Sequence, residues 1–203
     1  MFALICSFYS HSLKAEIYRK PLPNVAKTLD PIVFSDVFSS TIINQLYDRL
    51  FDIDELNNVK SKLASGWEVN SDGTKYNICL RNDVVFHDGK VLTSDDVAFT
   101  LQRLLSKKSV FSSEFSIIKG ARAFQSGEQK AVRGIQINSP SCLTIELEKP
   151  FPIFINMLAA LRTEILPFQF HGRSEEDFFK QPVGTGPFKI LKYESTTVRL
   201  SWE

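Results

Sequence analysis

The chain of 203 residues is 43% hydrophobic, and its 24 basic residues almost cancel its 23 acidic ones. That much apolar sequence suffices for a folded core and excludes global disorder, while near-neutral charge gives no electrostatic reason to expect nucleic-acid binding. The sequence contains no run of 18 apolar residues that would predict a membrane span, and no internal repeat.

The N-terminal stretch is interpreted separately from the fold. Residues 2–9 are mostly apolar, and residues 12–15 resemble the end of a secretory signal, with a processing site after Ala15. The stretch lacks a basic start. We interpret residues 1–15 as a partial signal segment rather than as a mature helix.

A helix is expected after the first extended segment. Pro31 disfavours the helical region for Asp30, and the helix is expected to start at Ser39 or Ser40. Phe51-Asp52 should end it before a polar loop. Its buried stripe is expected to consist of Ile42, Ile43, Leu46, Tyr47 and Leu50.

Residues 63–97 combine turn signals with alternating apolar sequence. Asp72-Gly73 is typical of a hairpin turn, and it precedes a half-buried strand over residues 75–81. Asp88-Gly89 predicts a second turn, which follows a short strand over residues 84–86. A helix should come directly after this second turn.

The helix that closes this stretch has a clear start signal. Thr93 can cap it through its hydroxyl group, and Asp95 and Asp96 place negative charge in its first turn, where such charge is favourable. Apolar residues recur at helical spacing to about Leu105. A polar connection rich in Ser and Lys is expected to follow.

The second half of the chain predicts a hairpin and a short helix. Residues 132–137 and 143–147 are expected to pair across a turn at residues 138–141. The apolar pattern then predicts a mostly buried helix from Phe154 to Leu158.

The last part of the chain predicts one helix and two strands. Residues 174–180 form a polar helical segment that is expected to be solvated. The glycine-rich segment 183–187 leads into two alternating strands, over residues 188–193 and 197–202.

No catalytic constellation is found in the sequence. His87-Asp88 could suggest a general base, but the glycine that follows makes the pair part of a turn. Gly184-Thr185-Gly186 lacks the third glycine of a phosphate-binding loop, and Pro187 removes a backbone donor. Trp67 is expected to pack over the sheet rather than to stack on a ligand.

Metal binding and disulfide formation are not expected either. His11, His87 and His171 are not at ligand spacing from a cysteine or from each other, so we expect no metal and no cofactor. Cys79 and Cys142 lie in or beside predicted strands. They could form a disulfide if those strands were neighbours in an oxidising compartment, but we expect two separate half-buried thiols.

Seven motifs follow one another along the chain in a recognisable order. They are LDP (29–31), LYDRLF (46–51), LASGWEV (63–69), DGTKYNICLR (72–81), VVFHDGKVLTSDDV (84–97), IELEKPFPIF (145–154) and VGTGPFKI (183–190). Taken in order, these motifs resemble the bacterial extracellular solute-binding proteins of family 5, the peptide and nickel class of ABC importer components. The agreement in order and spacing covers about residues 27–203, with a departure at Arg49, where the family usually has glycine.

The resemblance implies a mixed α/β (α+β) fold. From the resemblance we expect the N-terminal lobe of a periplasmic-binding-protein-like class II (cluster C) fold, truncated before the second lobe. Residues 16–50 are expected to form the first part of the lobe I core, residues 51–165 an inserted small α+β subdomain, and residues 166–203 the return to that core.

The resemblance also implies a binding protein rather than an enzyme. Such proteins enclose a ligand between two lobes and deliver it to a membrane permease. We expect a peptide or another small solute as ligand, the permease subunits of an ABC importer as partners, no nucleic acid, and a location in the periplasm or at the outer face of the cytoplasmic membrane. The motifs do not distinguish among oligopeptide, dipeptide, nickel and haem.

The expected ligand contacts lie in the loop after LDP, in Phe34, Ser35, Asp36 and Val37. This loop resembles the family segment that faces the cleft, where Asp36 could meet a cationic group. Two alternatives stay open, namely that Phe34 belongs to the core and that Asp36 caps the next helix.

A chain with only one lobe leaves most of a ligand's surface wet, so we expect weak or no binding by this chain alone. A separately encoded second lobe would complete the receptor. The alternative is a split-gene or degraded relic that retains a foldable lobe and acts at most as an interaction domain.

Overall fold

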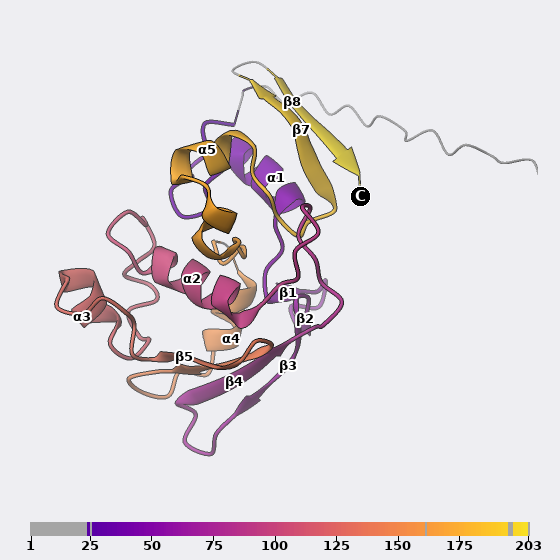
Figure 1. The fold of residues 1–203 in the computed structure, drawn as a ribbon. Coiled ribbons are helices and arrows are strands. Elements are labelled where there is room, and N and C mark those ends of the chain that lie inside the picture. Colours follow the sequence, from indigo (N-terminus) through magenta and orange to yellow (C-terminus); the bar gives the residue numbers. More distant parts are fainter. Residues whose placement is uncertain (1–23, 25, 161, 195–196, 203) are drawn as a thin grey trace, which may run out of the picture.

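The computed structural model describes residue 24 and residues 26–160, 162–194 and 197–202 (Figure 1). The partial signal segment expected at residues 1–15 lies outside the described residues. The elements in chain order are α1 (Val37–Leu46), β1 (Phe51–Ile53), β2 (Val59–Ser61), β3 (Ala64–Val69), β4 (Lys75–Leu80), α2 (Ser94–Leu104), α3 (Ala121–Ser126), β5 (Ile135–Ser139), β6 (Cys142–Glu146), α4 (Phe154–Ala159), the 3-10 helix η1 (Phe168–Gly172), α5 (Glu175–Lys180), β7 (Phe188–Glu194) and β8 (Thr197–Trp202).

A four-stranded antiparallel sheet with the order β3-β4-β6-β5 forms the base of the molecule in Figure 1. Strand β4 turns Tyr76, Ile78 and Leu80 into the core, and its other residues face outward. Helix α2 packs on β5 and β6, and α4 packs on the β1–β2 hairpin. The hydrophobic cluster between these elements draws mainly on residues 50–165.

A second hydrophobic cluster surrounds α1. It draws on residues 26–47 and 166–190, and it includes the buried stripe of α1, Phe170 and Phe178. The β7–β8 hairpin packs beside α1 (Figure 1). The domain boundaries expected at 50/51 and 165/166 stay a prediction.

Arg103 on α2 connects the two clusters. Its guanidinium donates to both oxygens of Asp30, at 3.2 and 2.9 Å, and to Glu175 at 2.8 Å. The Arg103 and Asp30 side chains are only 10% and 7% exposed. A bidentate, charge-assisted pair of this kind fixes orientation strongly, so the Asp of the LDP motif holds the start of the chain against α2.

The helix expected from Ser39 or Ser40 begins earlier and ends earlier. The structure has α1 from Val37 to Leu46, because Asp36 supplies the N-cap. Tyr47 and Leu50 are buried as expected, at 2% and 1% exposure, but they lie beyond the helix. The expectation that Phe51 ends the helix is wrong, since Phe51 opens strand β1.

Most of the other predicted elements are confirmed. Thr93 and Asp96 form a capping box at the start of α2, and strands β4 to β8 lie within one to three residues of the expected ranges. The run 84–86 is not a strand, since only Val85 makes a single bridge, to Val91. Helix α5 is not fully solvated, because Phe178 is completely buried.

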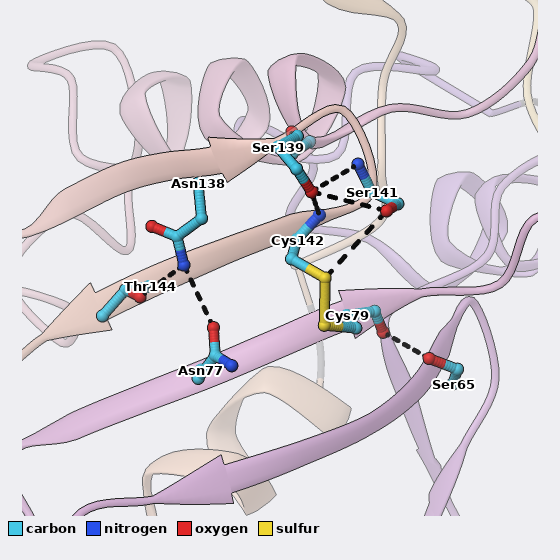
Figure 2. The surroundings of a disulfide bond; sticks show 9 residues. Ser65, Asn77, Cys79, Asn138, Ser139, Ser141, Cys142 and Thr144 are labelled. Carbon is cyan, nitrogen blue, oxygen red and sulfur yellow. Dashed lines mark hydrogen bonds between the residues drawn. A yellow bond between two sulfur atoms is a disulfide. The ribbon is translucent and has the colours of Figure 1, made fainter.

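The expectation of two separate thiols is wrong. Cys79 and Cys142 are directly paired residues of β4 and β6, with a Cα–Cα distance of 4.1 Å, and they form a disulfide (Figure 2). On β4, Cys79 alternates with buried residues, so the bond lies on the outer face of the sheet. Asn138 lies on the same face and donates to Asn77 and Thr144, at 3.1 and 2.8 Å.

Candidate functional site

Asp36 caps α1. Its Oδ1 accepts from the Ser39 backbone N–H at 2.9 Å, and its Oδ2 accepts from the Ser39 hydroxyl at 2.7 Å. Desolvation raises the pKa of Asp36, but the hydrogen bonds from Ser39 outweigh it and hold the pKa below its ordinary value. The carboxylate is therefore charged at neutral pH and already bound at the helix start.

Phe34, two residues earlier, is a core residue with 3% exposure. Its ring lies under the guanidinium of Arg162, 3.4 Å from ring centroid to Cζ, and its carbonyl oxygen accepts a hydrogen bond from Arg162 Nη1. Ser35 is exposed, and Val37 is 75% exposed. Of the four expected ligand contacts, only Ser35 and Val37 thus present open side chains.

Arg162 was not singled out from the sequence. It lies between two aromatic rings, since its Cζ is also 4.2 Å from the Phe111 ring centroid, and it adopts a left-handed φ of 79°. Burial lowers the pKa of Arg162. Stacking on two rings and bonding to the Phe34 carbonyl together fix the loop that holds residues 34–37.

Glu164 lies next to this cation and is 1% exposed. Its Oε1 lies 3.2 Å from Arg49 Nη1, and its Oε2 has no hydrogen-bond partner among the described residues. Burial raises the pKa of Glu164, and the attraction of Arg49 and Arg162 offsets this only in part. Arg49, at the position where a glycine was expected, thus forms an ion pair with a buried carboxylate. The sequence signal was an acidic residue inside the apolar segment 160–168.

A polar hollow of about 140 Å³ lies at the C-terminal end of α1. Asp48, Arg49 and Lys62 are among the residues that line it. Lys62 Nζ is 3.6 Å from Asp48 Oδ1, and burial raises the pKa of Asp48 against the attraction of Lys62. Charges of both signs on its walls favour a small polar group over an apolar one.

The glycine-rich segment before β7 packs its backbone against α1. A Cβ at Gly184 would collide with the Leu46 carbonyl, and one at Gly186 with the Gln45 carbonyl. His87 holds this segment, because Gly184 N–H donates to His87 Nδ1 at 3.2 Å and His87 Nε2 lies 2.8 Å from Gly186 O. These contacts require the proton on Nε2. The glycines of this segment thus serve close packing of its backbone against α1.

His87 and Asp88 lie in a turn, as expected, and both hold other segments in place. Gly89 N–H donates to Phe86 O at 2.7 Å to close the turn. Asp88 Oδ2 lies 2.7 Å from His171 Nδ1. Neither residue joins a nucleophile within the described part of the chain.

Two further features concern metals and membranes. Over the described residues, no group of three His, Cys, Asp or Glu side chains is arranged to hold a metal ion. None of the helices in the described part of the chain combines the length and apolar character that a membrane span requires.

Comparison with known proteins gives a family match over most of the chain. A model described as bacterial extracellular solute-binding proteins, family 5 Middle, matches residues 58–201. Glutathione-binding protein GsiB of Salmonella typhimurium is 30% identical over 169 residues, which are 83% of this chain and 31% of the relative. The homologue from Escherichia coli O157:H7 is 28% identical over 170 residues. The chain spans about a third of the length of the curated relatives it matches.

Solved structures give the same result for the fold. A periplasmic oligopeptide-binding protein from Borrelia burgdorferi matches this chain with a TM-score of 0.78 and 27% sequence identity. The match covers 88% of this chain and 37% of the Borrelia protein. NikZ from Campylobacter jejuni, solved in complex with Ni(L-His), matches with a TM-score of 0.66 and 29% sequence identity, over 84% of this chain and 32% of NikZ. OppA of Burkholderia pseudomallei matches with a TM-score of 0.79 at 22% identity, covering 90% and 37%. The expected mixed α/β substrate-binding fold is confirmed.

Proposed function

Because this chain belongs to the bacterial extracellular solute-binding proteins of family 5, we propose that it is part of the solute-binding component of an ABC importer for peptides or related small solutes. The supporting observation is the structural match to solved substrate-binding proteins. It includes 84–90% of this chain and 32–37% of the length of those proteins. The chain supplies one wall of the solute site, and it is not an enzyme.

Residues 34–37 are the proposed solute-facing segment. Arg162 holds Phe34 through contacts with its ring and its carbonyl oxygen, and the cap at Asp36 fixes the helix start. Ser35 and Val37 remain exposed. Asp36, charged and half-buried, attracts a cationic group through its field, and Phe34 shapes the loop.

The proposed location is the periplasm or the outer face of the cytoplasmic membrane. The disulfide between Cys79 and Cys142 supports it, because such bonds persist in oxidising compartments and are rare in the cytosol. The permease subunits of the importer are the proposed membrane partners. A separately encoded second lobe is the proposed partner for closing the site.

Calorimetric titration of the chain with mixed di- to pentapeptides tests the need for a second wall. We expect no micromolar binding, because one wall leaves most of a peptide solvated. Micromolar affinity would overturn this part of the proposal. A screen for hydrolase turnover should be negative, and robust turnover would contradict the binding role.

The DNA on both sides of the gene separates the receptor from the alternative of a relic that acts at most as an interaction domain. We expect a coding sequence for a second lobe, in frame or as its own chain, near permease genes. A genome that encodes no second lobe would favour the relic.

A further inference from the structure

The core-facing side of the four-stranded sheet extends beyond the elements that cover it. Trp67 pairs with Ile78 in register, and Val69 pairs with Tyr76. Directly paired residues of an antiparallel sheet point to the same face, so Trp67 and Val69 face the core side. Ile78 and Tyr76 are 0% and 3% exposed, but Trp67 and Val69 are 37% and 45% exposed. The edge strand β3 therefore leaves apolar core-facing surface open.

A pocket of about 370 Å³ lies over this open surface. Phe151, its two flanking prolines, Ile155 and Asn156 of α4, and Val59 of β2 also line this pocket. For comparison, a buried apolar cavity of about 150 Å³ is enough to bind benzene. The pocket thus has room for a molecule of one or two fused rings.

The pocket walls are held in place by contacts of their own. The Trp67 ring meets Phe51 edge-on, with centroids 5.0 Å apart. The Tyr76 ring contacts Phe154 at the same centroid distance, and its hydroxyl donates to the Phe151 carbonyl at 3.0 Å. Fixed aromatic walls reduce the ordering that a ligand must impose on binding.

The chemistry of the lining selects a neutral ligand. None of the residues that line the pocket is charged, and the exposed amide of Asn156 is its main polar group. A charged ligand would lose hydration without gaining a partner of opposite charge. We propose that this pocket is a binding site for a small, neutral, planar aromatic molecule, with Trp67 and Phe151 as its walls and Asn156 as its hydrogen-bonding group. No residue of the segment 34–37 contributes to it, so it is independent of the proposed solute site.

Indole titration followed by ¹H–¹⁵N NMR tests the proposal. The chain has two tryptophans, so the side-chain N–H signal of Trp67 can be assigned by one substitution at Trp202. For a ligand with about nine heavy atoms, we expect saturable shifts of this signal with a dissociation constant of about 1 mM. Tryptamine and indole-3-acetate, which carry a charge, should bind at least about tenfold more weakly.

Two variants and a matched control locate the site. Val69→Lys and Asn156→Lys each place a charge at an exposed position that lines the pocket, and each should weaken indole binding at least about tenfold. Val91→Lys changes a valine of 57% exposure that does not line the pocket, and it should leave binding unchanged. A response that does not saturate, that Val69→Lys leaves intact, or that the charged analogues share equally would overturn the proposal.

Discussion

Removal of the Cys79–Cys142 disulfide should cost much of the stability of this chain without damaging its core. Both cysteines lie on the outer face of the sheet, so Cys79→Ala with Cys142→Ala leaves no cavity in the core. The bond closes a loop with a sequence separation of 63. In the chain-entropy description, a loop of that length corresponds to about 4 kcal/mol at 25 °C.

Urea denaturation of the double variant and its parent measures this loss. Both proteins should carry Cys6→Ala, so that thiol titration reports the pair alone. With a denaturant slope of about 2 kcal/mol per molar urea, the midpoint should fall by about 2 M. Two titratable thiols in the oxidised, denatured parent, or a midpoint shift below about 0.3 M, would refute the reasoning.

Three other substitutions test the contacts around the candidate site. Asp36→Ala should lower the free energy of unfolding by about 1 kcal/mol through loss of the helix cap. Asp36→Asn keeps a capping oxygen and should lower it by less. Equal losses for the two variants in urea denaturation would contradict the role of Asp36 as the cap. His87→Phe leaves the buried Gly184 N–H unpaired and should cost about 1 to 3 kcal/mol. A loss below about 0.5 kcal/mol would be evidence against the ring contacts. Burial raises the pKa of Glu164 in the folded state above its ordinary value of 4.5. Between these two pKa values the folded state binds more protons than the unfolded state, so the free energy of unfolding should fall as pH rises through that range. Glu164→Gln should remove this contribution to the slope. Identical pH profiles would show that Glu164 is not the cause.

Local signals in the sequence were sufficient for most elements. Thr93 as a cap, with Asp95 and Asp96 in the first turn, predicts the start of α2. In the structure Asp96 Oδ2 accepts from the Thr93 backbone N–H and from its hydroxyl, at 2.7 and 2.9 Å. Strand β4 followed from alternation and the turn before it. The predicted start of α1, at Ser39 or Ser40, is two or three residues too late, because Asp36 supplies the N-cap and Val37 begins the helix.

Contacts between distant parts of the chain could not be predicted in the same way. The disulfide depends on the register of β4 with β6, which sequence spacing does not fix. Arg162 reaches Phe34 across 128 positions, and Arg49 reaches Glu164 across 115. In the sequence, Arg49 and Arg162 are each consistent with a solvated charge, so their buried partners become evident only in three dimensions.

Chemical-shift mapping with a pool of di- to pentapeptides at millimolar concentration tests the central claim most directly. If this chain is one wall of a solute-binding protein, the peptides should give weak, fast-exchange shifts centred on Ser35, Asp36 and Val37. The pocket at Trp67 should respond less than this segment. Tight binding that saturates at micromolar peptide, or shifts elsewhere with residues 34–37 unchanged, would contradict the account.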